Sequence, residues 1–521
     1  MSDKRMRKAY PLYVLALLTL VYVLNFVDRQ IVSVLGPALK AAFAVGDAEL
    51  GLLFGTAFAL CYALFALPLA RLVDGWNRVA TLALGLAAWS LVTALSALAG
   101  NFGQLAALRA LVGIGEASAA PAAFSLLQDH FPPERRATAI AVYQSGIYIG
   151  IGASMALGGY VLAGWPAAAP PFGLAGWQAS YLIAGLPGLA LALLIALTVR
   201  EPERNGESDG RSALAGIPAD LAMFVPGLSS LTLAAQVSAG AARRQTLVLA
   251  ATVAFTVTVI ALTDPFLSET RRTALANPFG VPVTTNVVQW VAIGLGIHGA
   301  AGWLALLRHR NPAAFAATAG ARAFRLLAIG GGVVSVAGYA MAGFTFTYGK
   351  QALGLTPADA PTLGLIACVM GGAGTILAGL LADAAHRRSV KGRIFVAITV
   401  LALAAAAWAW MLTARDMTQF YAANAAANLL QPMWLAPIFA AAQDRVAPDQ
   451  RGTATALQFL GTNLIGLGLG PYLVGLISDA TGDLCLAMLL ALATIPLAMA
   501  MFWRAGLSVA PAKAGVHVSV S

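Results

Sequence analysis

The sequence predicts an all-α membrane protein made of two pseudo-symmetric six-helix bundles, with two extra transmembrane helices inserted between them. The 521-residue chain is 59% hydrophobic and only 10% charged, whereas soluble domains carry roughly a quarter charged residues. Apolar runs long enough to cross a bilayer, about 20 residues each, recur along its whole length. Two pairs of segments also repeat at nearly the same spacing, which indicates duplicated halves.

Twelve apolar runs form two sets of six. The N-terminal bundle, 1–205, contains runs at 11–35, 50–72, 79–99, 104–128, 138–164 and 178–199. The C-terminal bundle, 326–505, contains runs at 326–349, 361–382, 394–414, 418–442, 453–478 and 484–504, and a short tail, 506–521, follows it.

The stretch between the bundles, 206–325, is a linker with inserted hydrophobic segments. Two apolar runs, 246–263 and 287–307, are each near the lower length limit for a span. We favour two extra transmembrane helices over a pair of packed or interfacial helices. If both runs cross the membrane, the loop near Arg271 lies on the side opposite the termini.

The positive charge is placed as expected for a membrane protein rather than a nucleic-acid-binding one. The net charge is +10, but the Lys and Arg residues sit in short clusters between apolar runs. Those clusters fall on one side of the predicted topology, together with the basic N-terminus. The positive-inside rule then places both termini in the cytoplasm, in a multi-pass protein of the inner membrane.

Several classes of function find no support in the sequence. Cys61, Cys368 and Cys485 all lie inside apolar runs and suggest neither a disulfide framework nor a metal site. No Gly-rich phosphate-binding loop, nucleophile–base pair or acidic metal-binding loop is found. We therefore expect no cofactor, no bound metal, no nucleic-acid partner and no enzymatic activity.

The internal repeat joins two segments in each half. Residues 128–139 (QDHFPPERRATA) resemble residues 443–454 (QDRVAPDQRGTA) at an offset of 315. Residues 70–78 (ARLVDGWNR) resemble residues 379–388 (GLLADAAHRR) at an offset of 309. Halves related in this way are typical of carriers that alternate access around a central site.

These segments resemble the major facilitator superfamily, and the N-terminal half resembles its Spinster branch. The loop segment 379–388 is similar to the superfamily's loop signature, and the copy at 70–78 departs from it at Ala70, Gly75 and Asn77. The Spinster resemblance rests on residues 24–31 (LNFVDRQI), 109–117 (RALVGIGEA), 125–133 (SLLQDHFPP) and 199–202 (VREP). It implies a secondary carrier, and we expect the protein to act as a monomer. Its relatives include exporters of sphingoid phosphates and lysophospholipids, and bacterial members are thought to be proton-driven.

Ionisable residues inside the predicted spans are candidates for proton coupling, because such groups are costly at bilayer depth. By helical rise, Asp28 and Arg109 share a depth and are predicted to pair across the first and fourth spans. Glu116 lies seven residues from Arg109 on nearly the same face, close to the midplane, where it could take up and release a proton. The alternative is a static ion pair that holds the two helices together.

Other polar residues are candidates for substrate binding or conformational switching. Arg29 could attract an anionic head group or pair with Glu116. The further candidates for substrate binding are Asn25, Tyr22, Gln144, Asn424, Asn428 and Gln431, of which the last three could instead form interhelical hydrogen bonds. The loop residues Asp74, Arg78, Asp383 and Arg387 are predicted to form conformational switches, with the two carboxylates capping helix N-termini.

Small residues recur every four positions in the fifth span, at Gly146, Gly150, Ser154 and Gly158. Such a stripe allows close approach of helix backbones, and we interpret it as a static packing surface.

The sequence thus predicts a proton-coupled secondary carrier for an amphipathic or organic anion, lysophospholipid-like or sphingoid-like by resemblance. Its partners would be a small-molecule or lipid-like substrate, protons and membrane lipids. The alternatives are a proton-coupled carrier of small sugars, organic acids or drugs, and, outside transport, a membrane sensor or receptor.

Overall fold

The described part of the chain is almost entirely helical. The computed structural model describes residues 2–166, 169–202, 217–266, 283–389, 391–447 and 450–507. Within these ranges, fourteen helices are long and apolar enough to cross a membrane. The predicted fold class, an all-α membrane protein with two added helices, is confirmed, and this is a multi-pass membrane protein.

The first half supplies six of these membrane-length helices, several of which are built from consecutive helical segments. In chain order its elements are α1 (Ser2–Phe43), α2 (Asp47–Gly51), the π-helical η1 (Leu52–Thr56), α3 (Ala57–Gly75), α4 (Arg78–Leu95), η2 (Ser96–Leu98), α5 (Phe102–Glu116), α6 (Ala119–His130), α7 (Pro133–Gly164), η3 (Pro171–Gly173) and α8 (Gly176–Thr198).

The second half repeats this plan. Its elements are α14 (Arg322–Leu353), η7 (Pro357–Asp359), α15 (Ala360–Arg388), α16 (Gly392–Leu412), α17 (Met417–Leu430), η8 (Gln431–Trp434), α18 (Leu435–Gln443), α19 (Arg451–Gly461), the π-helical η10 (Thr462–Leu467), α20 (Gly468–Thr481), α21 (Leu484–Leu492) and α22 (Thr494–Leu507).

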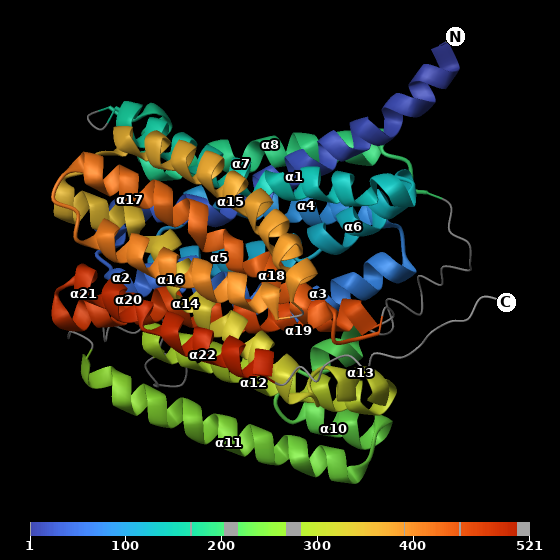
Figure 1. Ribbon diagram of the computed structural model, residues 1–521. Helices are drawn as coiled ribbons and strands as arrows, with labels where there is room; N and C mark the ends of the chain where they lie inside the picture. The colour runs from blue at the N-terminus through green and yellow to red at the C-terminus, as the bar shows by residue number, and fades with distance from the viewer. Residues whose placement is uncertain are drawn as a thin grey trace.

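Between the halves, the insert forms a helical hairpin at the edge of the molecule. It contains α10 (Leu228–Gln236), α11 (Ala239–Thr263), η4 (Asp264–Phe266), α12 (Thr285–Arg310) and α13 (Pro312–Ala317). Both α11 and α12 have the length and hydropathy of a membrane span, as predicted. Figure 1 shows α11 outermost, with α12 between it and the two halves. The predicted loop near Arg271 lies outside the described residues.

The two ends of the helical assembly are defined by the chain path. An even number of spans returns the chain to the end at which it began, so α1 begins and α22 ends at one end, here called the termini end. The opposite end, called the distal end, contains the turn 44–46 between α1 and α2 and the Gly482 that ends α20.

Glycines of α7 allow it to pack closely on two neighbours. A Cβ at Gly150 would lie 2.6 Å from the Val23 carbonyl oxygen of α1, and Gly146 and Gly158 also face α1. The predicted stripe is therefore a packing surface inside the first half. A second set faces the other half, because a Cβ at Gly152 would lie 2.8 Å from the Gly364 oxygen of α15.

This packing predicts different effects on stability for the same substitution at two glycines. Gly150→Ala should lower the melting temperature of the purified protein, because the added methyl group meets main chain and overpacking costs about 1–3 kcal/mol. Gly372→Ala is the control, since no atom lies within 4 Å of its added Cβ and alanine has the higher helix propensity. Its melting temperature should be equal to the parent's or higher. Equal melting temperatures for the two variants would contradict this account of α7.

Candidate functional site

The fourth span breaks immediately after Glu116. Its first segment, α5, ends there, and α6 begins at Ala119. Pro121 has no N–H to donate to the carbonyl of Ala117, and a proline ring crowds the carbonyl four residues before it. Breaks of this kind in transmembrane helices are common at binding sites in carriers.

Two glycines hold α5 against the neighbouring helices. A Cβ at Gly113 would lie 2.6 Å from the Phe58 oxygen of α3, and a Cβ at Gly115 would lie 2.9 Å from the Gly85 oxygen of α4. Larger residues would force α5 away from both. The close packing leaves Arg109 and Glu116, which are two helical turns apart, facing α1.

Arg29 of α1 and Glu116 of α5 form a buried ion pair. An Nη atom of Arg29 lies 3.0 Å from Oε2 of Glu116, and the two side chains are 11% and 0% exposed. The Asn25 amide also approaches the Glu116 carboxylate. The sequence left open whether Arg29 attracts an anionic head group or pairs with Glu116. In the structure it pairs with Glu116.

Aromatic rings surround the Arg29 guanidinium. Its central carbon lies 4.4 Å from the centroid of the Phe58 ring, 4.9 Å from that of Phe26 and 5.2 Å from that of Tyr62. A desolvated cation over several ring faces gains about 2 kcal/mol or more from such contacts. No sequence motif pointed to these rings, although Phe58 and Tyr62 are four residues apart and so share one helix face.

Arg109 contacts Asp28 differently from the prediction. Its Nη1 donates a hydrogen bond of 3.0 Å to the main-chain carbonyl of Asp28, and the described residues contain no ion pair with the Asp28 carboxylate. That carboxylate instead faces Trp89 and Thr93 of α4, near enough to Arg109 for an electrostatic interaction. The predicted pair between the side chains is therefore wrong in its geometry, because the side chain of Asp28 points from α1 toward α4.

Several buried polar atoms of this cluster make no hydrogen bond within the described part of the chain. They are Oδ1 of Asp28, Nε of Arg29, Nε and Nη2 of Arg109, and Oε1 of Glu116. Asp28, Arg109 and Glu116 are each at most 1% exposed. Buried polar groups in native proteins nearly always have partners, so the cluster retains capacity for a proton or a polar ligand.

Of the remaining candidates for substrate binding, Tyr22 lies near enough to Arg29 for an electrostatic interaction, and no contact joins the others to the ion pair within the described residues. Tyr22 stacks on Tyr143, with ring centroids 4.3 Å apart, and Gln144 is an exposed residue of α7. Asn428 donates hydrogen bonds of 2.9 Å to the main-chain and side-chain oxygens of Asn424. Gln431 begins the 3-10 segment η8 and packs against Gly338 of α14.

One further residue of the second half reaches the cluster. Tyr339 of α14 interacts electrostatically with Arg29, across the interface between the halves. The ion pair therefore belongs to the first half but faces the second.

The two halves are in direct contact at the distal end. The Asp479 carboxylate of α20 accepts hydrogen bonds from the main-chain N–H groups of Asp47 (3.0 Å) and Ala48 (2.8 Å), at the start of α2. Ser478 donates to Asp47 at 2.8 Å. A Cβ at Gly475 would lie 2.1 Å from the Asp47 oxygen. No sequence motif pointed to this contact.

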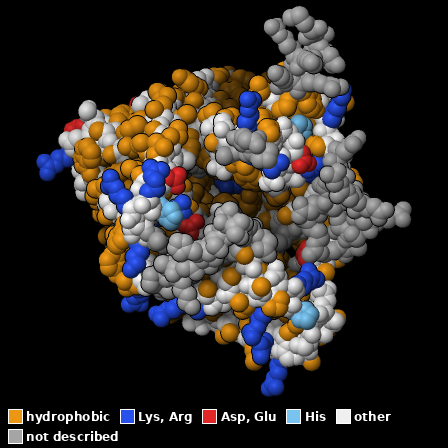
Figure 2. Space-filling model, turned by 45° about the vertical axis from the view of Figure 1, so that its right-hand side comes forward, with side chains coloured by type: hydrophobic (Ala, Val, Ile, Leu, Met, Phe, Trp, Pro, Cys, Tyr) orange, Lys and Arg blue, Asp and Glu red, His pale blue; other side chains and the backbone are white. Residues whose placement is uncertain are grey.

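The face at the termini end is open between the halves. Figure 2 shows it hollowed near its centre, with Lys and Arg side chains gathered around the hollow. Arg29 lies in the middle part of α1 (Ser2–Phe43), which runs between these two ends.

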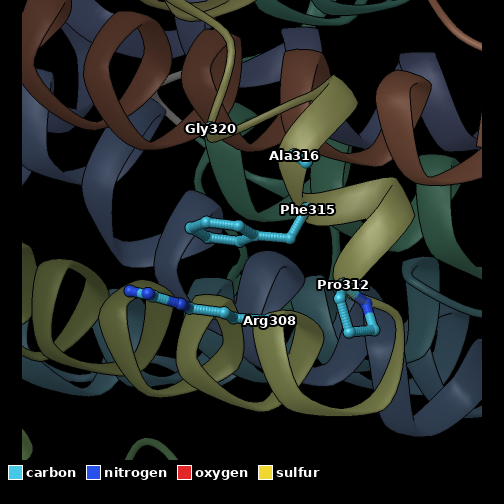
Figure 3. A pocket seen from close by; sticks show the side chains of 5 residues that line it. All are labelled: Arg308, Pro312, Phe315, Ala316 and Gly320. Atoms are coloured by element: carbon cyan, nitrogen blue, oxygen red, sulfur yellow. The ribbon is translucent and has the colours of Figure 1, made fainter.

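A separate open pocket lies on the insert. Arg308, at the end of α12, extends beside the Phe315 ring of α13, with its guanidinium carbon 5.6 Å from the ring centroid (Figure 3). Pro312, Ala316 and Gly320 complete its wall. It belongs to the insert, whereas the ion pair is built from α1 and α5.

The sequence model of the Major Facilitator Superfamily matches residues 18–471. The chain belongs to this superfamily. It is a major facilitator transporter, for which a small-molecule substrate is expected.

Relatives within the superfamily differ in what they transport. An MFS-type efflux pump of Mycolicibacterium smegmatis is 26% identical over 472 residues, which cover 89% of this chain and 84% of the pump. Protein spinster homolog 1 of Homo sapiens is 31% identical over 198 residues, which cover 37% of this chain and 35% of that protein. A hexuronate transporter of Bacillus subtilis is 31% identical over 137 residues, which cover 26% of this chain and 32% of the transporter. The last two similarities span only about a third of each relative.

The fold matches that of a bacterial homologue of the human lysosomal transporter Spinster. The crystal structure of its inward-facing, unoccupied conformation has a TM-score of 0.70 at 23% identity and covers 96% of this chain and 98% of that one. The occupied inward-facing structure has a TM-score of 0.66 at 21% identity. The predicted resemblance to Spinster proteins is confirmed.

The superfamily's loop regions form equivalent ion pairs in the two halves. Arg78 pairs with Asp129 and with Glu201, which lies 2.7 Å away. Arg393 pairs with Asp444 and with Asp383, at 3.4 Å. Arg393 and Asp444 follow Arg78 and Asp129 by 315 positions (393 − 78 and 444 − 129), so the repeat extends to side-chain contacts.

These contacts change the roles predicted for the loops. The N-terminus of α4 is capped by Asn77 and Glu201, which accept from Ala80 N and Val79 N, and the side chain of Asp74 lies outside the described residues. Asp383 pairs with Arg393 rather than capping a helix. Arg387 is exposed, and the counterpart of Arg78 is Arg393.

The two loop arginines should differ in their effect on stability. Arg78 is 4% exposed and Arg393 14% exposed. Arg78→Gln should therefore lower the melting temperature more than Arg393→Gln, because a buried hydrogen bond to a charged group contributes about 1.5–3 kcal/mol. Thermal unfolding of the two purified variants in the same lipid measures this. A larger loss for Arg393→Gln would count against the role assigned to Arg78.

Proposed function

We propose that this chain is a proton-coupled secondary carrier of an amphipathic or organic anion that works by alternating access. The observation that carries the proposal is the buried pair of Arg29 and Glu116, enclosed by aromatic rings. A charged pair at bilayer depth is costly. The pair offers one exchangeable proton and one cation that can recognise an anion.

Competition for Arg29 provides the coupling. While Glu116 is ionised, it occupies the guanidinium and opposes binding of a substrate anion. Protonation of Glu116 removes that competitor, so a proton and an anion favour each other's binding. Such coupling is reciprocal and typically amounts to about 5–150-fold in affinity, and its sign corresponds to symport. The charges of the Asp28 carboxylate and of Arg109 would set the electrostatic potential at the Arg29–Glu116 pair.

The proposed orientation places both termini in the cytoplasm and the protein in the inner membrane, as the charge distribution suggests. The hollow face then opens to the cytoplasm, and the Asp479 contact with α2 closes the opposite side. In this proposal the bundles 1–205 and 326–505 rock against each other around the ion pair, as a monomer. The insert 206–325 connects them.

The chemistry around Arg29 supports an anion with an apolar part. Phe26, Phe58 and Tyr62 contribute ring surface beside the cation, whereas a neutral sugar would need mainly hydrogen-bonding groups there. A lysophospholipid-like or sphingoid-like anion has both features. An organic acid such as a sugar acid is the second candidate, since it shares the anionic group and a hexuronate transporter is among the relatives.

The coupling proposal predicts separate effects on accumulation and exchange. Glu116→Gln, which resembles the protonated form, should abolish accumulation driven by a pH gradient and leave substrate exchange at equal pH largely intact. In the parent protein the affinity for the anion should change about tenfold with pH, and in Glu116→Gln this change should be absent. Flux assays in proteoliposomes, with and without the gradient, measure both.

Asp28→Asn provides a second test of the same cluster. It keeps the main-chain carbonyl that binds Arg109 but removes the negative charge beside it. We expect impaired gradient-driven transport and lower expression, because Arg109 then lacks a nearby counter-charge. If both variants retain full gradient-driven transport, the ion pair is only structural.

The substrate proposal is tested by a panel of compounds. Proteoliposomes should take up or exchange lysolipids or organic anions with saturation, and neutral sugars should give no specific signal. Phe58→Leu should weaken transport of the amphipathic anion more than that of a small organic acid, because it removes ring surface beside Arg29. Saturable sugar transport without any anion transport would refute the assignment.

A further inference from the structure

The inserted helix α12 packs on the seam between the two halves. It contacts α3 and η1 of the first half and α20 of the second. In Figure 1, α11 lies on the far side of α12 from the halves. The seam formed by α3 and α20 is therefore covered by a helix that belongs to neither half.

Two side chains from different elements donate to one carbonyl at this seam. Thr56 of η1 donates to the Gly468 oxygen at 2.6 Å. Gln289 of α12 donates to the same oxygen at 2.9 Å. Thr56 is 2% exposed and Gln289 0% exposed, and a carbonyl oxygen can accept two hydrogen bonds. The Gly468 carbonyl thus joins the first half, the second half and the insert.

The backbone around this carbonyl is irregular in both halves. The π-helical segments η1 and η10 contact each other, and η10 ends immediately before Gly468. Pro471 cannot donate to the Leu467 oxygen, and Gly55 packs against that oxygen, where a Cβ would lie at 2.3 Å. Such π segments often mark functional positions in helices.

A second group of hydrogen bonds attaches the insert to α20. The Tyr472 hydroxyl donates to Oδ1 of Asn286 at 2.9 Å. The Asn286 amide donates to Thr263 and Asp264, each at 2.8 Å, where α11 ends. Asn286 is 0% exposed. The start of α12, the end of α11 and α20 are therefore fixed together.

We propose that α12 is a clamp on the distal side of the carrier, in which Gln289 and Asn286 are positioning residues that hold the closed state. Two attachments bind α12 to the second half, and its remaining surface packs on α3 and η1. Opening the distal end must separate Thr56 from Gly468 and also separate η1 from α12. The insert therefore raises the free energy of opening beyond what the two halves contribute.

This inference rests on the proposed alternating access, but its test measures opening of the distal end rather than transport. A failed test would leave the coupling proposal unaffected. Likewise, a failure of Glu116→Gln to uncouple transport would not change the expected opening.

The reporter for opening is a single cysteine at position 48. Ala48 is 0% exposed in the contact between α2 and α20. Its bond to Asp479 uses the main chain, so Ala48→Cys preserves it. Cys61, Cys368 and Cys485 are first replaced by serine. The full-length carrier in lipid nanodiscs is then labelled with a hydrophilic methanethiosulfonate reagent, and the labelling rate is measured.

The clamp variants should label faster than the parent. Thr56→Val should raise the rate about fivefold, the effect expected for losing the one buried hydrogen bond that opening breaks. Gln289→Leu loosens the attachment of α12 to the second half, so it should raise the rate in the same direction. The matched control is Gln245→Leu. Gln245 is also a buried amide of the insert, but it donates at 3.0 Å to the His298 carbonyl within the insert. Its labelling rate should equal the parent's.

Two results would overturn the clamp. One is equal labelling of the Gln289→Leu and Gln245→Leu proteins, whether both match the parent or both are faster. The other result comes from Tyr472→Phe, which removes only the hydroxyl group that donates to Asn286. This variant also replaces Gln289→Leu in the test if Gln289→Leu does not fold. A parental rate for Tyr472→Phe would refute the clamp, and a faster rate supports it.

Discussion

A cation buried in a bilayer must be supplied with an anion by the protein, because no water is present to solvate it. Arg29 forms an ion pair with the Glu116 carboxylate and contacts three aromatic rings. This arrangement requires α5 to approach α3 and α4 at main-chain distance, which only glycines at 113 and 115 permit. The close packing of α5 on α3 and α4 is thus what brings the charged pair together inside the membrane.

The two ends of the carrier are held by different kinds of contact. At the distal end, the halves meet through main-chain groups, as in the capping of α2 by Asp479. At the termini end, the ion pairs of Arg78 and Arg393 each stay inside one half. Contacts within a half keep it rigid, whereas contacts between halves must break in each cycle of the proposed alternating access. This distribution suits rigid-body movement of two halves about a central site.

The sequence predicted the number and placement of the helices well, because span length and apolarity are set by the bilayer itself. For example, the run predicted at 287–307 is α12, Thr285–Arg310. Helix ends were less accurate, since polar residues continue a helix beyond its apolar part. The repeat was also found, but the counterpart of Arg78 was not. Arg393 follows Asp383 by ten residues, whereas Arg78 follows Asp74 by four, so alignment of the loop alone selected Arg387.

Side-chain pairing inside the membrane was predictable only in part. Depth along a helix follows from residue count, so the cluster of Asp28, Arg29, Arg109 and Glu116 could be assembled from the sequence. Which partner each residue takes depends on helix rotation, and adjacent residues point about 100° apart. Arg29 therefore took the position facing Glu116, and Asp28 turned toward α4. The distal contact of Asp479 had no signal, because a carboxylate that caps a helix from another half has no local sequence pattern.

The insert breaks the symmetry that the duplicated halves would otherwise impose. Two pseudo-symmetric bundles meet at two seams, one formed by α3 and α20 and the other by α7 and α15. The first carries α12, with buried polar attachments at Gly468. The second is closed by main-chain contact of Gly152 with Gly364 and by the hydrogen bond of 2.7 Å between Thr375 and Tyr148. The clamp proposed for α12 therefore acts on the α3–α20 seam alone, and among the described residues the α7–α15 seam is held only by contacts that the two halves themselves make.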